Sequence, residues 1–342
     1  MRKACLFYPV ILSLALAAGA QNFFDNYVYQ QWNSFGGLTG ATATDIIQTE
    51  DGFINIGTYE GLVRFDGVEF TTLKRSRHND YTFASVRNVM EDHRGCLWIG
   101  ANDEGVQVIQ PEGNKTFTTQ NGLPNNSVRA MVEDKAGNVW VGTAAGVVYM
   151  TPTRHLLTPQ FEAGTISKGV ISTGLFCDSD GRVWLTTEND NGLFVFKDGL
   201  FHAISAMAPF EPFQATAVCQ DSNGIVWVGT DTVGIVKIEN NKAQQIRTGT
   251  ILDTVTTSTI YESPDGNIWF GTNSGLAVYS GGKFYVCPKE NVRNAKINKI
   301  IQDREGNIWI ATDRNGIGKL THGMFKMTKS DGASNAIAEG LD

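Results

Sequence analysis

Two arginines occupy the same position relative to a recurrent motif. Arg87 and Arg129 each stand eight residues before the glycine of a Gly-x-x-Trp sequence. A guanidinium group presents its N–H donors as a planar fork, which suits a carboxylate or a sulfate group. The shared spacing therefore supports the hypothesis that both side chains converge on one anionic ligand. The simpler alternative is that each arginine pairs with a local acid such as Asp103 or Glu104.

The sequence lacks the patterns that are typical of catalysis or metal binding. None of its five histidines lies in a His-Glu-x-x-His motif, and it contains no nucleophile elbow and no P-loop. The run from Asp178 to Gly181 is similar to the start of a calcium loop but lacks the remaining ligands, which favours a turn. We expect no catalytic residue, no metal and no cofactor. His93 and His322 are expected in hairpin turns away from the binding end.

The motif that follows the arginines is part of a tandem repeat. Its glycines recur at steps of 40 to 44 residues: Gly52, Gly95, Gly137, Gly181, Gly224, Gly266 and Gly306. A tryptophan follows three residues later in every copy except the first, which has Asn55. A period of about 42 residues without a helical pattern is typical of a propeller with four strands per blade. The predicted fold class is all-β, a seven-bladed β-propeller of four-stranded antiparallel blades.

Each copy divides into the strands of one blade. The first strand ends in an acidic turn, as in Val89–Asp92, where the aspartate can accept backbone N–H groups. The second strand has consecutive apolar residues, as in Val139–Val141, which indicates cover on both faces. A Gly-Thr pair closes that strand, and an Asp-Gly pair such as Asp198-Gly199 predicts the last hairpin. Blades packed in a ring would supply this cover.

A ring of blades must also protect its last strand edge. Residues Tyr27–Trp32 precede the first inner strand and have no blade of their own, so we predict that they pair into blade seven. Residues Met324–Lys329 compete for the same edge. Residues 330–342 repeat the loop and strand that open a blade, and we interpret them as the truncated start of an eighth repeat.

The first twenty residues have the pattern of a secretory signal peptide. Arg2 and Lys3 precede an uncharged stretch, and Ala18, Gly19 and Ala20 are small residues suited to cleavage after Ala20. The stretch is short for a bilayer span, which disfavours the alternative of an uncleaved anchor, and no later segment is apolar enough for one. We expect a periplasmic mature chain with a propeller over residues 21–329.

Charge and cysteine content restrict the possible partners. The net charge is -7, and no basic cluster is large enough for a nucleic-acid backbone, so no nucleic-acid partner is expected. The cysteines beyond the signal segment are Cys96, Cys177, Cys219 and Cys287. They lack metal-ligand spacing and occupy different positions in their repeats, so we interpret them as small buried side chains, with a disulfide as the alternative.

One repeat carries a family resemblance. The segment Asn121–Val128, followed by Val132–Asp134, Trp140–Thr143 and Gly146-Val147, closely resembles the two-component regulator propeller repeat. The resemblance extends over all seven copies, about residues 22 to 329. Single copies depart from it: Asn55 replaces tryptophan, Ser263 replaces aspartate, Thr186 and Ala311 replace the glycine before threonine, and Ala101 replaces the threonine.

The resemblance implies a function. Such propellers form the extracytoplasmic sensor region of hybrid two-component histidine kinases, so it implies a periplasmic sensor that responds to a glycan or another small solute. Kinase activity and phosphorelay would belong to the parent receptor, which the resemblance also allows to be a homodimer. Such receptors continue into further domains, whereas this sequence ends at Asp342, so we expect a fragment of a longer sensor.

The candidate ligand-binding residues lie where propellers bind ligands, on the face formed by blade-joining loops and by loops between second and third strands. The residues eight positions before each repeat glycine should form a polar ring at this channel mouth: Thr44, Arg87, Arg129, Thr173, Thr216, Ser258 and Asn298. With the loops included, the candidates are Arg77, Tyr81, Arg87, Glu104, Arg129, Glu188, Phe213, Asp231 and Arg314. The expected ligand is a small molecule or an oligosaccharide, and the arginine pair favours an acidic glycan.

Two other functions stay open. The segment Gly266–Phe270 also looks like the repeat of virginiamycin B lyase, and such enzymes use a histidine near the channel mouth of a late blade. Blades five to seven show no histidine at such a place, so the lyase is the alternative rather than the prediction. A binding or scaffold propeller without signalling output would differ only in the part of the protein beyond residue 342.

Overall fold

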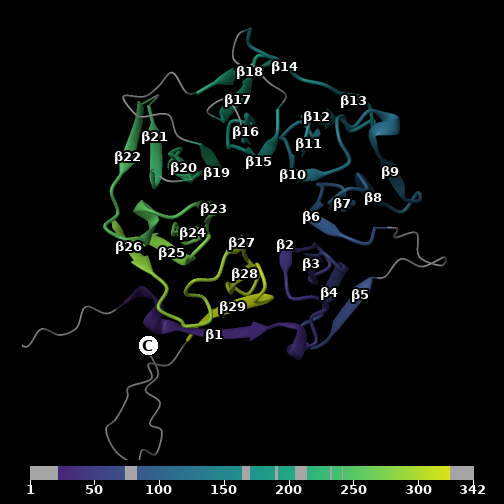
Figure 1. The fold of residues 1–342 in the computed structure, drawn as a ribbon. Helices are drawn as coiled ribbons and strands as arrows, with labels where there is room; N and C mark the ends of the chain where they lie inside the picture. Colours follow the sequence, from purple (N-terminus) through teal and green to yellow (C-terminus); the bar gives the residue numbers. More distant parts are fainter. Residues whose placement is uncertain are drawn as a thin grey trace, which may run out of the picture.

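The structure is a computed structural model that describes residues 22–73, 83–163, 170–188, 192–204, 214–231, 233–240 and 242–323. These residues form seven sheets arranged as a ring around a central axis (Figure 1). The prediction of an all-β, seven-bladed propeller is confirmed. The expected signal peptide, Met324–Lys329 and the expected eighth repeat lie outside the described residues.

Each blade has an inner, a second, a third and an outer strand, and neighbouring strands are antiparallel. The inner strands are β2 (Ala43–Gln48), β6 (Val86–Glu91), β10 (Val128–Glu133), β15 (Ser172–Cys177), β19 (Ala215–Gln220), β23 (Thr257–Glu262) and β27 (Ile297–Gln302). The second strands are β3 (Ile54–Thr58), β7 (Leu97–Ala101), β11 (Val139–Thr143), β16 (Val183–Thr187), β20 (Val226–Thr230), β24 (Ile268–Thr272) and β28 (Ile308–Thr312). The third strands are β4 (Gly61–Phe65), β8 (Val106–Ile109), β12 (Gly146–Met150), β17 (Leu193–Lys197), β21 (Ile235–Glu239), β25 (Gly275–Ser280) and β29 (Ile317–His322). The outer strands are β5 (Phe70–Leu73), β9 (Lys115–Phe117), β13 (Leu156–Leu157), β18 (Leu200–Ala203), β22 (Lys242–Ile246), β26 (Lys283–Val286) and β1 (Tyr27–Trp32).

Blade four departs from the four-stranded pattern. A fifth strand, β14 (Gln160–Phe161), pairs in parallel with the outer strand β18. The Phe161 ring stacks on Phe201 of β18 with centroids 4.9 Å apart, so the connection from blade three is held against the blade edge. Four 3₁₀ turns also occur in the described loops: η1 (Phe23–Asn26), η2 (Ser34–Gly36), η3 (Thr119–Asn121) and η5 (Ile251–Asp253).

The second strands are the most enclosed part of the molecule. Every residue of β11, β20 and β24 is buried, as their consecutive apolar residues predict. The glycine before the last residue of the second strand allows this packing. A Cβ atom on Gly142 would lie 2.1 Å from Ser172 Oγ, and one on Gly100 would lie 2.6 Å from Val128 Cγ1. In the five blades that have this glycine, the backbone of the second strand therefore approaches the inner strand of the next blade closely.

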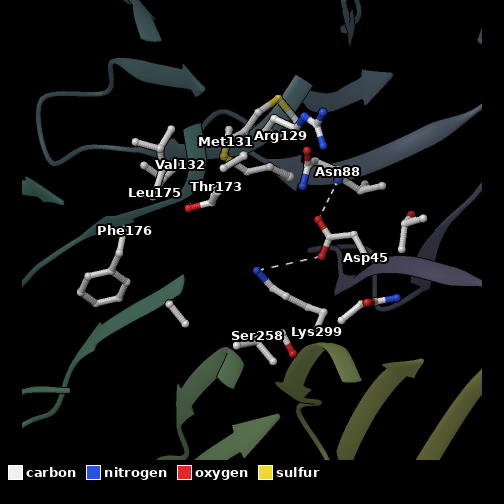
Figure 2. A pocket seen from close by; sticks show the side chains of 18 of the residues that line it. Asp45, Asn88, Arg129, Met131, Val132, Thr173, Leu175, Phe176, Ser258 and Lys299 are labelled. Atoms are coloured by element: carbon white, nitrogen blue, oxygen red, sulfur yellow. Dashed lines mark hydrogen bonds and ion pairs between the residues drawn. The ribbon is translucent and has the colours of Figure 1, made fainter. Parts of the chain in front are cut away.

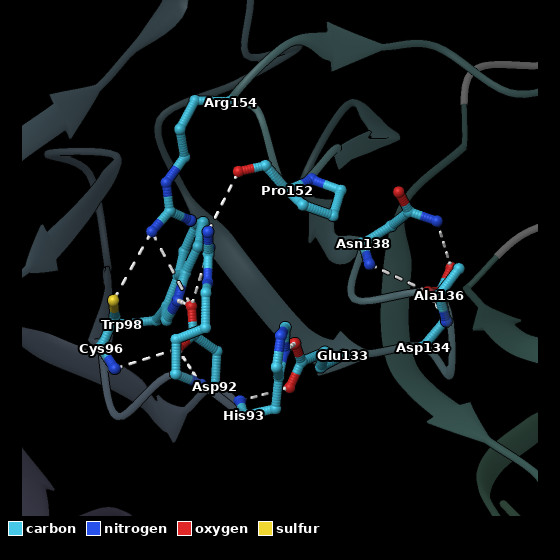
Figure 3. Close-up of polar contacts among 11 residues, drawn as sticks. Asp92, His93, Cys96, Trp98, Glu133, Asp134, Ala136, Asn138, Pro152 and Arg154 are labelled. Atoms are coloured by element: carbon cyan, nitrogen blue, oxygen red, sulfur yellow. Dashed lines mark hydrogen bonds and ion pairs between the residues drawn. The ribbon is translucent and has the colours of Figure 1, made fainter.

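The turn aspartate joins the tryptophan to the backbone of each blade (Figure 3). In blade two, Asp92 Oδ2 accepts a hydrogen bond from Trp98 Nε1 at 2.9 Å, and Asp92 Oδ1 accepts the backbone N–H of Cys96 at 2.9 Å. The same indole-to-carboxylate bond occurs in blades three, four, five and seven, between Trp140 and Asp134, Trp184 and Asp178, Trp227 and Asp221, and Trp309 and Asp303. We call this contact the turn clamp.

Two blades keep the turn clamp with other residues. In blade six, Trp269 Nε1 donates to Ser263 Oγ at 2.9 Å, and that hydroxyl donates to Asp265. In blade one both partners are replaced, and Asn55 Nδ2 donates to Thr49 Oγ1 at 2.9 Å. Thr49 Oγ1 in turn donates to Asp51 Oδ1 at 2.6 Å. A hydroxyl at the clamp is thus accompanied by an aspartate two residues later in both cases.

A second set of hydrogen bonds joins neighbouring blades at the clamp end. The Glu or Gln before the turn accepts the backbone N–H of the preceding blade's turn, as Glu133 does from His93 at 2.8 Å (Figure 3). The further donor and acceptor pairs are Glu50 to Glu91, Ser179 to Gln220, Ser222 to Glu262 and Arg304 to Gln48. The last of these joins blade seven to blade one. We call this set the inter-blade belt.

Strand β1 closes the ring. It pairs antiparallel with β29 from Tyr27 opposite His322 to Trp32 opposite Ile317, which confirms the prediction for Tyr27–Trp32. Trp32 also stacks on Trp309 of blade seven with centroids 5.5 Å apart. Because the outer strand comes from the N-terminus, His322 ends a paired strand. The expectation that His322 lies in a hairpin turn was wrong, whereas His93 does lie in the turn between β6 and β7.

The four cysteines in the described part of the chain are free thiols. Cys96, Cys219 and Cys287 are buried, and Cys177 is half-buried. Burial raises the pKa of Cys219 to about 12 and that of Cys287 to about 11, which keeps these thiols protonated and unreactive near neutral pH.

The turn clamp can be tested in blade five. Asp221 is buried and accepts from Trp227 Nε1 and from two backbone N–H groups, so Asp221→Ser should lower the free energy of unfolding by about 2 kcal/mol or more. Adding Asn223→Asp reproduces the blade-six arrangement and should restore part of this loss. Chemical denaturation of the two single variants and the double variant measures the coupling. Strictly additive effects would contradict the clamp.

Candidate functional site

The inner strands of all seven blades surround a cavity of about 450 Å³ (Figure 2). The inner strands start at the end where the loops between second and third strands emerge. Backbone hydrogen bonds join these loops to the residues just before the inner strands, as from Glu188 N to Ile171 O at 3.0 Å and from Ala144 N to Ser127 O at 3.0 Å. This end is the mouth that the sequence predicts for a ligand, and the clamps lie at the opposite end.

The polar ring at the mouth is built on β-bulges. In every blade the pairing register between inner and second strand shifts at the residue eight positions before the repeat glycine. A bulge leaves one residue outside the ladder and redirects its side chain. Six of the seven ring residues line the cavity: Thr44, Arg129, Thr173, Thr216, Ser258 and Asn298.

Most of the ring performs a structural task. Thr44 Oγ1 donates to Val86 O of the next blade at 2.9 Å, and Thr216 Oγ1 donates to Thr257 O at 2.6 Å. The same bond to the next blade is made by Ser258 to Ile297 and by Asn298 to Ala43. Thr173 instead donates to Thr186 Oγ1 of its own blade at 2.8 Å. These short side chains fasten neighbouring inner strands together.

The two arginines of the ring behave differently. Arg87 Nη1 donates to the neutral Asn102 Oδ1 at 2.9 Å. Arg129 Nε is buried and has no hydrogen-bond partner. Burial and the neighbouring positive charge of Arg129 lower the pKa of Arg87, while Tyr59 and Glu188 act in the opposite direction. The structure therefore brings both guanidinium groups into one electrostatic environment.

The local acids are not partners of these arginines in the described part of the chain. No ion pair there joins Arg87 or Arg129 to Asp103 or Glu104. Glu104 Oε2 instead accepts the backbone N–H of Ala84 at 2.9 Å. The alternative of local pairing therefore has no support in the described geometry.

The other predicted residues are scattered. Glu188 is exposed in blade four and acts electrostatically on Arg87. Arg314 is exposed in blade seven with φ of 71°, and its backbone N–H donates to Thr42 Oγ1 at 3.3 Å. Asp231 is half-buried in blade five, and its carbonyl accepts from Thr256 Oγ1 at 3.1 Å. Arg77, Tyr81 and Phe213 lie outside the described residues.

Sequence reasoning missed Tyr59. This residue is 48% exposed in the loop between β3 and β4 and lies within electrostatic reach of Arg87. The corresponding position in blade three is Ala144. An alignment of the repeats contains the signal, because blade one has an aromatic residue at a loop position where blade three has alanine.

A buried polar group inside the channel was also missed. Asp45 of β2 accepts the backbone N–H groups of Ile46 at 2.9 Å and of Val89 at 3.0 Å, and it lies 4.0 Å from Lys299 Nζ (Figure 2). Asn88 adds a side-chain hydrogen bond. Asp45, Asn88 and Lys299 all stand seven residues before a repeat glycine, where blades three to five have Ala, Gly and Ala. These residues tie blades seven, one and two together.

The described part of the chain offers little catalytic chemistry. None of the described histidines lines the cavity: His93 contacts Glu133, His155 contacts Thr153, His202 contacts Glu162, and His322 packs on Tyr27. No group of three His, Cys, Asp or Glu side chains there could hold a metal ion. No helix of the described segments is long and apolar enough to span a membrane.

The fold and the ring of repeats define the class of protein, a seven-bladed propeller with a polar channel mouth. A family model described as two component regulator propeller matches residues 122–145, 214–232, 251–274 and 291–314. The chain thus carries two-component regulator propeller repeats. No curated protein matches its sequence.

Solved structures share the fold at low sequence identity. The extracellular domain assigned to hybrid two component system BT3049 from B. thetaiotaomicron is 21% identical with a TM-score of 0.71, covering 87% of this chain and 42% of that one. The corresponding domain of BT4673 from the same organism is 18% identical with a TM-score of 0.66, covering 86% and 39%. Virginiamycin B lyase from Staphylococcus aureus is 16% identical with a TM-score of 0.69, covering 86% and 99%. The chain thus spans less than half the length of the first two structures.

The buried carboxylate makes a pH-dependent contribution that can be measured. Burial raises the pKa of Asp45 despite the opposing effects of Lys299 and the backbone N–H groups. The folded state then binds the proton more tightly than the unfolded state, so stability rises as pH falls through this pKa. The wild type should gain stability relative to Asp45→Asn between about pH 7 and about pH 4 in denaturant titrations.

An exposed aspartate supplies the control of opposite sign. The backbone N–H groups of Glu69 and Val68 lower the pKa of Asp66, so its contribution is lost as pH falls. The wild type should lose stability relative to Asp66→Asn over the acidic end of the same titration. Parallel pH curves for the wild type and Asp45→Asn would show that the Asp45 assignment is wrong.

Proposed function

We propose that this chain is the periplasmic, ligand-sensing propeller of a hybrid two-component system and that it binds a small solute or an oligosaccharide at the channel mouth. Its two-component regulator propeller repeats and its fold similarity to extracellular domains of such systems support this proposal. Histidine kinase activity and phosphorelay belong to the parent receptor in this proposal, which also allows a homodimer of that receptor.

One observation carries the proposal for the mouth as the binding site. Four of the short ring side chains donate to the backbone of the next blade, whereas Arg87, Arg129, Glu188 and Tyr59 lie at the mouth without such a bond. Polar and aromatic groups that converge beside a cavity and that the fold does not use are the usual mark of a ligand site.

The lyase alternative rests on fold similarity and on the likeness of Gly266–Phe270 to the lyase repeat. The Staphylococcus aureus enzyme is 16% identical to this chain, and no described histidine lines the cavity here. The third candidate function, a binding or scaffold propeller without signalling output, shares the mouth and differs in the other domains of the parent protein.

Ligand binding is testable by thermal unfolding of the purified chain in the presence of neutral and acidic saccharides. A solute that binds only the folded state raises the melting temperature, and at about a hundred times its Kd it stabilises by about 2.7 kcal/mol. We expect at least one saccharide to do so, with a smaller shift in Tyr59→Ala, at the mouth, and an unchanged shift in Val68→Ala, which is 84% exposed on an outer hairpin. Conversion of a streptogramin by the chain, with no saccharide binding, would instead favour the lyase.

The signalling role has a separate test in the gene. The reading frame that encodes Asp342 is expected to continue into further repeats, a membrane-spanning helix and a histidine kinase. Sequencing the genomic locus downstream of this codon provides the measurement. A stop codon directly after residue 342 would reject the sensor proposal and favour the scaffold function, while leaving ligand binding at the mouth intact.

A further inference from the structure

We propose that Arg87 and Arg129 form an oxyanion subsite at the channel mouth, which takes a carboxylate or sulfate group carried by a small solute. This inference rests on the proposed function and deepens it, because it names the chemical group that the ligand presents to blades two and three.

The two arginines do not make the hydrogen bond to the next blade that most of the short ring side chains make. Four blades use this bulge position to donate a hydrogen bond to the backbone of the next blade, as Thr44 does to Val86. Arg87 instead donates to Asn102 in its own blade, and Arg129 Nε has no partner. A long charged side chain at a bulge that redirects it toward the mouth therefore requires another explanation.

No carboxylate in the described segments forms an ion pair with either guanidinium group. Glu104 is occupied by the Ala84 backbone N–H, and Glu188 acts on Arg87 only at longer range. Two like charges brought together by adjacent blades repel one another, and burial strengthens that repulsion. An anion placed between them would reverse the sign of this interaction.

The channel has an electrostatic direction. The other basic side chain that lines the channel, Lys299, is paired with Asp45. The oxygens of Asp45 already accept hydrogen bonds from backbone and side-chain donors. Glu91 and Glu133 line the cavity toward the clamp end. Among these charged side chains of the cavity lining, Arg129 lies at the mouth and the two glutamates lie toward the clamp end, which favours an anionic group near Arg129 over one deeper in the channel.

The donor geometry suits an oxyanion. Asn102 holds one Nη of Arg87 and so orients its fork while leaving other N–H groups available. The buried Nε of Arg129 lacks an acceptor, so no hydrogen bond through this atom holds the guanidinium group to the scaffold, and its fork can turn toward a ligand oxygen. Paired guanidinium forks are the groups that proteins use to bind carboxylate and sulfate.

Calorimetric titration of the purified chain at constant ionic strength tests the subsite with sodium glucuronate and sodium sulfate as probes and glucose as the neutral control. Arg87→Gln and Arg129→Gln should each weaken glucuronate binding about tenfold or more, as expected for the loss of a charged hydrogen bond. Glu188→Gln should strengthen it, because a competing negative charge is removed. Arg293→Gln removes the same charge from an exposed arginine on the same face and should leave binding unchanged.

Each outcome decides between the two proposals. Equal glucuronate affinity in the wild type and in the Arg87→Gln, Arg129→Gln double variant, or no binding of either anion to the wild type, would overturn the subsite. If a neutral saccharide still raises the melting temperature of that double variant, the proposed sensor stands without it. If sulfate binds through the arginines but neither glucuronate nor any neutral saccharide binds, the subsite stands and the proposed saccharide-sensing function fails.

Discussion

The structure depends on one constraint: no blade covers its own second strand. The consecutive apolar residues of β11 need a neighbour on each side, and Gly142 allows the neighbouring inner strand to approach so closely that a Cβ atom would collide with Ser172. A row of such blades would leave one apolar face and one strand edge exposed. Closure of the ring by β1, with Trp32 stacked on Trp309, removes both at once.

Apolar packing alone leaves open the angle between neighbouring blades and the shift of one blade along the other. Hydrogen bonds fix both. The clamp ties each tryptophan to its own turn, and the belt ties the turns of five blades to the next inner strand. Because the clamp and the belt both lie at one end of the blades, the loops at the opposite end can differ in sequence from blade to blade. Blade one shows how drift is tolerated within the clamp: Asn55, Thr49 and Asp51 change together and preserve a buried hydrogen-bonded chain. A single replacement of the tryptophan or the aspartate would leave a buried polar group without a partner.

The sequence predicted the parts of the structure that repeat. Glycine spacing gave the number of blades, and an unpaired strand pattern at Tyr27–Trp32 gave the closure. Features that occur once were out of reach: β14 arises in a non-repeated connection, and the pairing of Asp45 with Lys299 joins blades at opposite ends of the chain. The polar ring was located, but its bulges and its hydrogen bonds to the next blade were not. Spacing fixes a position within a blade and says nothing about which backbone group lies across the interface.

This distinction between repeated and single features also supports the proposed site. The short polar residues of the ring are explained by the scaffold in four blades, where they donate to the backbone of the next blade. Arg87, Arg129 and Tyr59 differ from the residues at the same positions in most other blades. No hydrogen bond to the next blade in the described part of the chain explains them. Clamps, belt and closure leave the blades few alternative packings, so a ligand at the mouth has little means of reshaping the ring. On the proposed function, the signal must then pass through the changed charge and surface of the mouth itself, because a neighbouring domain or subunit can read these without any movement inside a blade.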